Sequence, residues 1–145
     1  MILYLDTSAL VKRYVVEPGS KEVNALIEQA DAVGSVTLTQ VEMASALAKA
    51  VGTNWVDANN AELAWQDFLA QWQSFARLSV TPGLLERAAR LAWEYGLRGY
   101  DATHFAAALI WQEMLEIPVT LATYDRELWQ VAKKAGMAVW PEELA

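Results

Sequence analysis

Short apolar runs alternate with amphipathic stretches along this chain. Five runs have the length of strands: residues 2–5, 32–36, 78–80, 118–122 and 137–140. Between them, apolar residues recur every three or four positions, which predicts helices at residues 8–16, around 23–30, about 39–51, 55–77, 82–96, 100–115 and 125–135. This alternation indicates an α/β fold with a mostly parallel sheet of short strands, and the length favours a single domain over residues 1–145.

Turn and capping residues refine these boundaries. Thr81 precedes a proline, which predicts a capped helix start. Gly34 weakens the strand at 32–36, and Thr37 or Thr39 is expected to cap the helix that follows. The stretch 105–111 (FAAALIW) is apolar nearly all round, so we expect a buried central helix there.

Composition excludes several classes of protein. Hydrophobic residues make up 54% of the 145 positions, enough for a sizeable core. The chain has no Cys, which excludes disulfides, thiolate metal sites and a Cys nucleophile. No run approaches the roughly 18 apolar residues of a membrane span, and the start lacks the pattern of a signal peptide, so we expect a cytoplasmic protein. The seven Trp residues are expected to serve core and interface packing rather than stacking on bases.

The formal net charge is −7 at pH 7, which argues against broad electrostatic binding of nucleic acid. A site that binds a divalent ion would offset part of this charge, and local positive charge near a cleft is enough to bind a phosphate group. The acidic surface also suits a basic protein partner.

Two acids follow predicted strands. Asp6 comes directly after the strand at 2–5, and Asp125 follows the strand at 118–122. Ligands of open α/β sheets bind at the carboxyl ends of the strands, so both positions favour a binding site. Each acid also precedes a helix, and a simple N-cap is the alternative for both.

Two further acids lie near helix starts. Asp101 opens the apolar helix, and Phe105 and Ala108 share its face, so its carboxylate points toward buried surface. Glu42 lies near the start of the helix at 39–51, where Ser45 and Ala46 leave its side chain room to reach inward. Taken alone, Asp101 is also explained as an ordinary helix-start acid and Glu42 as a surface residue.

The four acids have a common chemical consequence if they converge. In a parallel sheet, strand ends and helix starts meet at one edge. Carboxylates there repel one another, each pair about 4 Å apart costing about 4 kcal/mol at an effective dielectric near 20. A divalent cation relieves this repulsion, and oxygen ligands favour Mg²⁺ or Mn²⁺. Such ions support phosphoryl chemistry.

Four segments resemble, in order, the motifs of PIN-domain nucleases, and most closely the VapC-type toxins of bacterial and archaeal toxin–antitoxin pairs. They are MILYLDTSALVKRYVVEPGS, TLTQVEMASALAKA, LRGYDATHFAAAL and TYDRELWQVAKKAGM. The resemblance implies a three-layer α/β/α sandwich, a homodimer, a Mg²⁺- or Mn²⁺-dependent endoribonuclease that cuts RNA, and inhibition by a VapB-like antitoxin. By position, it assigns the acidic quartet to Asp6, Glu42, Asp101 and Asp125.

In the mechanism that follows as a hypothesis, Asp6 and Asp101 ligate the principal ion, while Glu42 and Asp125 complete its surroundings. A metal-bound water, deprotonated with help from a carboxylate, attacks the phosphodiester.

Neighbouring residues have open roles at this point. Arg98 is equally suited to contact phosphate or to pair with a surface acid. His104 is the only histidine, and a core hydrogen bond is favoured over a metal or proton role. Thr7, Ser8 and Thr123 can orient carboxylates, but helix capping is favoured for them.

Two other functions are compatible with parts of the pattern. One is a phosphatase with Asp6 as nucleophile, but such enzymes usually carry a second Asp two residues later, where this chain has Ser8. The other is a PIN-fold binding module with little or no cleavage. The sequence leaves open which RNA is cut and how many ions are bound.

Overall fold

A five-stranded sheet lies at the centre of the computed structural model, which describes residues 1–144. Its strands are β1 (Ile2–Leu5), β2 (Ala32–Val36), β3 (Ala76–Leu78), β4 (Val119–Ala122) and β5 (Ala138–Trp140). They lie in the order β3-β2-β1-β4-β5, and every neighbouring pair is parallel. The predicted parallel sheet is therefore confirmed. The prediction of a mostly parallel sheet allowed an antiparallel strand, but residues 1–144 add none to it. β1 lies in the middle, between β2 and β4, where the order of the strands reverses.

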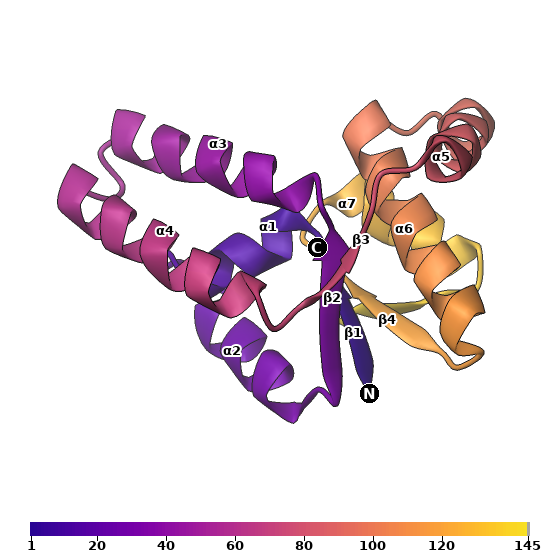
Figure 1. Cartoon of the computed structure of the whole chain (residues 1–145), viewed down its shortest axis with the longest axis horizontal. Helices are drawn as coiled ribbons and strands as arrows, with labels where there is room; N and C mark the ends of the chain where they lie inside the picture. The colour runs from indigo at the N-terminus through magenta and orange to yellow at the C-terminus, as the bar shows by residue number, and fades with distance from the viewer. Residues whose placement is uncertain (145) are drawn as a thin grey trace.

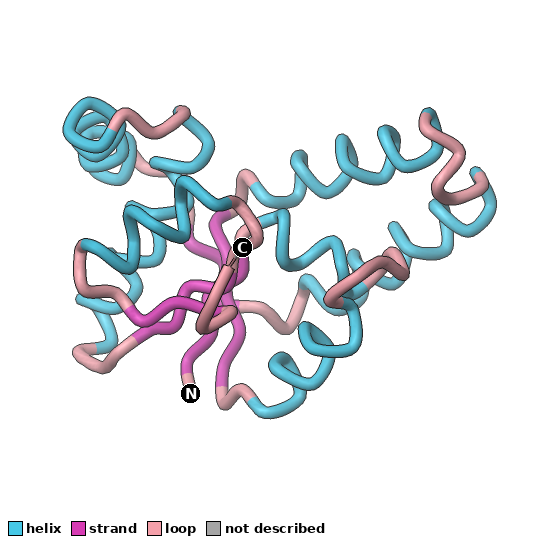
Figure 2. Tube along the Cα trace, turned by 180° about the vertical axis from the view of Figure 1, so that it is seen from behind, coloured by secondary structure: helices cyan, strands magenta, loops and turns pink. Residues whose placement is uncertain are grey.

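Helices cover both faces of this sheet (Figures 1 and 2). They are α1 (Thr7–Leu10), α2 (Ser20–Gln29), α3 (Thr39–Gly52), α4 (Ala58–Trp72), α5 (Pro82–Tyr95), α6 (Gly99–Leu115) and α7 (Arg126–Lys134), and a short 3₁₀ turn, η1 (Val11–Arg13), follows α1. In Figure 1, α5, α6 and α7 lie on one side of the strands, and α1, α2 and α4 lie on the other. The pair α3 and α4 extends from the sheet as a helical hairpin. Within residues 1–144, no helix is both long and apolar enough to cross a membrane.

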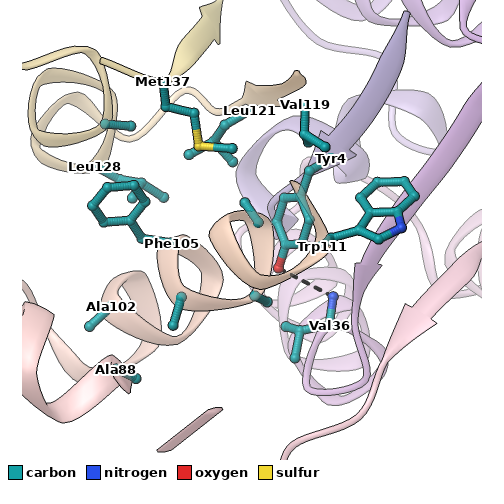
Figure 3. Close-up of a cluster of buried hydrophobic side chains, with 14 of the residues drawn as sticks. Tyr4, Val36, Ala88, Ala102, Phe105, Trp111, Val119, Leu121, Leu128 and Met137 are labelled. Carbon is teal, nitrogen blue, oxygen red and sulfur yellow. Dashed lines mark hydrogen bonds between the residues drawn. The ribbon is translucent and has the colours of Figure 1, made fainter. Parts of the chain in front are cut away.

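The side chains of β1 alternate between two hydrophobic cores. Tyr4 points into the core beneath α6, which Figure 3 shows, whereas Leu3 and Leu5 point into the core formed with α1, α2 and α4. The predicted central helix is confirmed, because Phe105 and the three alanines after it in α6 are fully buried. This burial fixes α6 against the sheet, and with it the acid in its first turn.

Gly34 explains how α6 approaches the sheet so closely. A Cβ added at Gly34 would lie 2.7 Å from the ring of Trp111 and 2.9 Å from the carbonyl oxygen of Ala76. The glycine thus leaves room for an indole ring over β2, as is common where a group approaches a strand closely. Trp72, Trp111 and Trp129 are buried, as expected for packing residues, but Trp93 on α5 is 93% exposed.

The first helix is shorter than the predicted range 8–16. The α-helix ends at Leu10, and the 3₁₀ turn that follows ends at Arg13. The chain then turns so that Val15 packs with Leu47 and Ala64 in a small cluster beneath the α3–α4 hairpin. A continuous helix to residue 16 is therefore wrong, because this tertiary packing outweighs the local helical pattern.

Two other boundaries also differ from prediction. The predicted helix 55–77 is limited to α4, because Asp57 caps its start through Asn60 and residues 76–78 instead pair with β2 as β3. β3 consequently begins two residues earlier than the predicted strand 78–80.

The expectation that Thr37 or Thr39 caps the helix at 39–51 is wrong. The α3 helix has no side-chain cap, and the Thr39 hydroxyl instead bonds to the Ser35 hydroxyl at 2.7 Å.

Candidate active site

The candidate site lies at the carboxyl edge of the sheet, where β1 and β4 end. These strands pair in register from Ile2 and Val119 to Leu5 and Ala122. One residue further, the Asp6 amide still donates to the carbonyl of Ala122 at 3.2 Å. Asp6 therefore lies level with Thr123, at the point where the strand order reverses and ligands of such sheets bind.

Asp6 is a buried carboxylate, 3% exposed, with donors on both oxygens. Its Oδ1 accepts from the Ser8 hydroxyl at 2.7 Å and from the Ala9 amide at 3.1 Å, while its Oδ2 accepts from the Thr123 hydroxyl at 2.5 Å. Burial raises the pKa of Asp6 above its ordinary value, although His104 and these donors oppose the rise. Asp6 is thus both the N-cap of α1 and a carboxylate held in a fixed position.

Hydroxyl groups link this carboxylate to the next one. The Thr123 hydroxyl, which donates to Asp6, accepts from the Asp125 amide at 3.0 Å. Ser8 accepts from the Tyr124 amide at 2.8 Å. The expectation that Ser8 and Thr123 merely cap helices is wrong, because the caps of α1 and α7 are the acids themselves.

Asp101 and Asp125 share one guanidinium group. Arg98 donates from Nε to Asp101 Oδ2 at 2.9 Å and from Nη2 to Asp125 Oδ2 at 2.7 Å. Asp125 also caps α7, its Oδ1 accepting from the Leu128 amide at 2.9 Å. Burial raises the pKa of Asp101, Arg98 lowers it, and the charge of Asp125 raises it again, so that the net shift is upward. Of the two roles left open for Arg98, the observed one is pairing with acids, and both are members of the predicted quartet.

Glu42 is held by one of its two oxygens. Its Oε1 accepts from the Thr7 hydroxyl at 2.8 Å and lies 2.6 Å from Nε2 of His104. Burial alone would raise the pKa of Glu42, but the hydrogen bond and charge of His104 and the bond from Thr7 lower it overall. The reading of Glu42 as a plain surface residue is therefore wrong, and so is capping as the role of the Thr7 hydroxyl.

His104 makes the core hydrogen bond expected of it. The ring is 2% exposed, and its Nδ1 lies 2.8 Å from the Tyr4 hydroxyl. Its second contact, with Glu42, was not predicted from the sequence. The only local signal was its position one helical turn after Asp101 on the same helix.

The four acids thus lie along one edge of the sheet and are connected through shared partners. Thr123 connects Asp6 with Asp125, Arg98 connects Asp125 with Asp101, and Glu42 bonds to the residue after Asp6. As the side chains stand, no three His, Asp or Glu residues within 1–144 are close enough to hold one metal ion. Protein donors occupy the carboxylates instead, so joint binding of a cation requires rearrangement of side chains.

The chemistry of these residues fits a hard divalent cation. All four are carboxylates, and such oxygen ligands suit Mg²⁺ or Mn²⁺ better than softer ions. Burial raises the pKa of both Asp6 and Asp101, which means that their negative charge is incompletely compensated by the protein. A cation at this edge would supply the missing positive charge.

Comparison with known proteins agrees with this fold. The PIN domain family model matches residues 3–134. Ribonuclease VapC45 of Mycobacterium tuberculosis (strain CDC 1551 / Oshkosh) is 34% identical over 148 aligned residues, which cover 99% of this chain and 97% of that protein. A second ribonuclease, VapC49 of strain ATCC 25618 / H37Rv, matches with the same identity and coverage.

Solved structures confirm the expected three-layer α/β/α sandwich. PAE2754 from Pyrobaculum aerophilum has a TM-score of 0.66 and 27% identity, covering 96% of this chain and 83% of that one. VapBC2 from Rickettsia felis, bound to a DNA fragment from its promoter, has a TM-score of 0.64 and 14% identity over 96% and 97% of the two chains, and supports the fold alone. The chain described here belongs to the PIN-domain family, among the VapC-type ribonucleases.

Proposed function

We propose that this chain is a metal-dependent endoribonuclease and the toxin of a toxin–antitoxin pair, with residues 1–145 forming one nuclease domain. Its similarity to VapC ribonucleases over nearly the whole length supports RNA as the substrate. The observation that carries the proposal is the connected row of carboxylates at one edge of the sheet, which includes the buried Asp6 at the end of the central strand β1.

In this proposal Asp6 and Asp101 hold Mg²⁺ or Mn²⁺ directly, and Glu42 and Asp125 complete the surroundings of the ion. When bound, such an ion polarises the phosphate and makes an attacking water more acidic. The hydroxyls of Ser8 and Thr123 keep the Asp6 carboxylate oriented throughout.

The remaining residues contact the attacking water and the substrate. Glu42 has a lowered pKa, so it is ionised at neutral pH, and its Oε2, the oxygen that Thr7 and His104 leave free, can accept a hydrogen bond from an attacking water. Arg98 is 69% exposed and reaches both Asp101 and Asp125. Its planar fork also matches a phosphate, so we assign it to the RNA backbone once the carboxylates engage the cation.

The proposed partners follow from charge and from the structural relatives. The related structures include toxin–antitoxin complexes, which supports a VapB-like antitoxin as partner, and we also expect a homodimer. With a net charge of −7, this chain suits a basic antitoxin segment over its acidic edge. That component of binding should weaken in high salt. We assign the protein to the cytoplasm, where its RNA substrate is found.

The test is cleavage of RNA by the purified chain. We expect cutting with Mg²⁺ or Mn²⁺ and none in excess chelator, and sequencing of the fragment ends should show 5′-phosphates and 3′-hydroxyls. Cutting that persists undiminished in chelator would contradict the metal-dependent proposal. Tight antitoxin binding without cutting of any RNA would instead indicate a binding module.

A further inference from the structure

A chain of buried hydrogen bonds connects the sheet to Glu42. The Val36 amide donates to the Tyr4 hydroxyl at 3.2 Å, as Figure 3 shows by a dashed line. The Tyr4 hydroxyl lies 2.8 Å from His104 Nδ1, and His104 Nε2 lies 2.6 Å from Glu42 Oε1. This chain of hydrogen bonds begins in the middle of the molecule, at β1 and β2, and ends at Glu42, one of the four acids.

This hydrogen-bond chain runs through a mainly apolar core, in which the buried Ser35 is a polar neighbour of the Tyr4 hydroxyl. Tyr4 is fully buried, and its ring meets that of His104 edge to face, with centroids 5.9 Å apart. Around the two rings lie apolar residues such as Val36, Phe105 and Trp111. Burying two polar rings costs free energy that apolar side chains would avoid, so packing alone does not explain their presence.

The Glu42 carboxylate fixes one proton of His104. A carboxylate oxygen only accepts, so the 2.6 Å contact places a proton on Nε2, which donates to Glu42 Oε1. On the other side of the ring, Nδ1 contacts the Tyr4 hydroxyl, which is itself held by the Val36 amide. The ring is therefore held between a hydroxyl fixed by β2 and the carboxylate.

The last bonds of this hydrogen-bond chain determine how Glu42 is oriented. His104 and Thr7 both bond to Oε1 and neither bonds to Oε2. Glu42 also borders a hollow of about 390 Å³ between α3 and α6, with Lys49 and Tyr100 on its walls. A long side chain near a helix start is thus held in one rotamer, with one oxygen left for a ligand.

We propose that His104, itself fixed by Tyr4, is a positioning residue that holds the Glu42 carboxylate in its working orientation at the candidate site. Both ring nitrogens of His104 are engaged, so it acts through Glu42 and not as a ligand. This inference rests on the proposed function, because it gives Glu42 a role in binding the cation and in cleavage.

The contact itself can be tested without any activity. His104 is the only histidine in the chain, so ¹⁵N-histidine labelling reports on this ring alone. We expect a proton on Nε2, with Nδ1 shifted by Tyr4→Phe and Nε2 shifted by Glu42→Gln. A ring with no proton on Nε2, or a ring unaffected by Glu42→Gln, would overturn the proposed hydrogen-bond chain.

The positioning role requires a second measurement. Tyr4→Phe and His104→Leu should each weaken Mn²⁺ binding and lower kcat by roughly 10- to 100-fold, the range found for outer-shell partners of metal ligands, with little change in the KM for RNA. His104→Gln should recover part of the Mn²⁺ affinity and part of the kcat that His104→Leu loses, because the glutamine amide can still donate to Glu42. Tyr95→Phe is the matched control, since Tyr95 packs on Phe105 in the same core and should behave like wild type.

The outcomes separate the two proposals. If wild type neither binds Mn²⁺ nor cuts RNA, the proposed function is wrong, whatever the histidine spectrum shows. If wild type does both, and folded Tyr4→Phe matches it in Mn²⁺ affinity and kcat, the positioning role is wrong. Should His104→Leu fail to fold, Tyr4→Phe and His104→Gln still decide the question.

Discussion

Arg98 donates from Nη2 to Asp125 at 2.7 Å and so joins the first turns of α6 and α7, although the two residues are 27 positions apart. The same guanidinium holds Asp101 from Nε. Two of the four acids at the sheet edge thus share one internal cation, which compensates only part of their negative charge. In the proposed function a divalent ion uses these same carboxylates, so Arg98 competes with it.

Arg98→Ala is therefore expected to have opposite effects on metal and on RNA. Mn²⁺ should bind a few-fold more tightly, because one competing positive charge is gone, whereas the KM for RNA should rise. Calorimetry with Mn²⁺ and steady-state kinetics measure the two effects. Arg87→Ala, which removes a comparable ion pair with Glu113, should change neither. Unchanged or weaker Mn²⁺ binding by Arg98→Ala would count against competition.

Bound metal should stabilise the fold through Asp6. At about 100 times its Kd, an ion adds about 2.7 kcal/mol to the free energy of unfolding, since it binds only the folded chain. For a chain of this size that corresponds to a rise in Tm of roughly 5–10 °C. Thermal unfolding with Mn²⁺ and with chelator should show this rise for wild type and for the exposed control Asp67→Asn, but not for Asp6→Asn. A full rise in Asp6→Asn would remove Asp6 from the ligands.

The raised pKa of Asp6 predicts a pH dependence of stability in the metal-free protein. A carboxyl whose pKa is higher folded than unfolded stabilises the fold below its unfolded pKa, about 3.9, and this contribution is lost as the pH rises through the folded pKa. Wild type should therefore lose stability relative to Asp6→Asn between acid and neutral pH. Urea unfolding in chelator measures the difference. If the free energy of unfolding of wild type instead rises relative to that of Asp6→Asn as the pH rises, the donors around Asp6 outweigh its burial.

Gly34→Ala should destabilise the protein by about 1–3 kcal/mol, the usual cost of overpacking a core. The added methyl group meets the ring of Trp111 on one side and the Ala76 carbonyl on the other. Gly52→Ala is the control, because no atom lies within 4 Å of its added Cβ. Urea unfolding of both variants gives the comparison. Equal stabilities would show that Trp111 shifts without cost.

Local signals in the sequence were enough to predict most elements of the fold. Thr81 caps α5 through the Leu84 amide, as the Thr-Pro pair indicated, and Asp6 follows β1 as its position in the sequence required. The helix predicted to run to residue 77 failed because residues 73–77 have no strong pattern of their own. Pairing of β3 with Gly34–Val36 decides their conformation, and such pairing depends on distant residues.

The sequence singled out four acids that the structure places along one edge of the sheet, but it did not reveal their hydrogen-bond partners. The bonds between Asp6 and Thr123 and between Glu42 and His104 join residues 117 and 62 positions apart. Predicting them requires the order of the strands and the rotamer of each side chain. The same limit explains why Ser8 and Thr123 were interpreted as helix caps, since a capping hydroxyl and one that orients a carboxylate look alike in sequence.

The most direct test of the central claim compares wild type, Asp101→Asn and Asp67→Asn in Mn²⁺ binding and in RNA cleavage. The loss of a carboxylate that holds the ion removes several kcal/mol of charge stabilisation, so cleavage by Asp101→Asn should fall by about 10³-fold. Mn²⁺ binding should fall with it, while circular dichroism and the Asp67→Asn control stay as in wild type. Cleavage by a folded Asp101→Asn at the wild-type rate would contradict a carboxylate-held metal ion at this edge of the sheet.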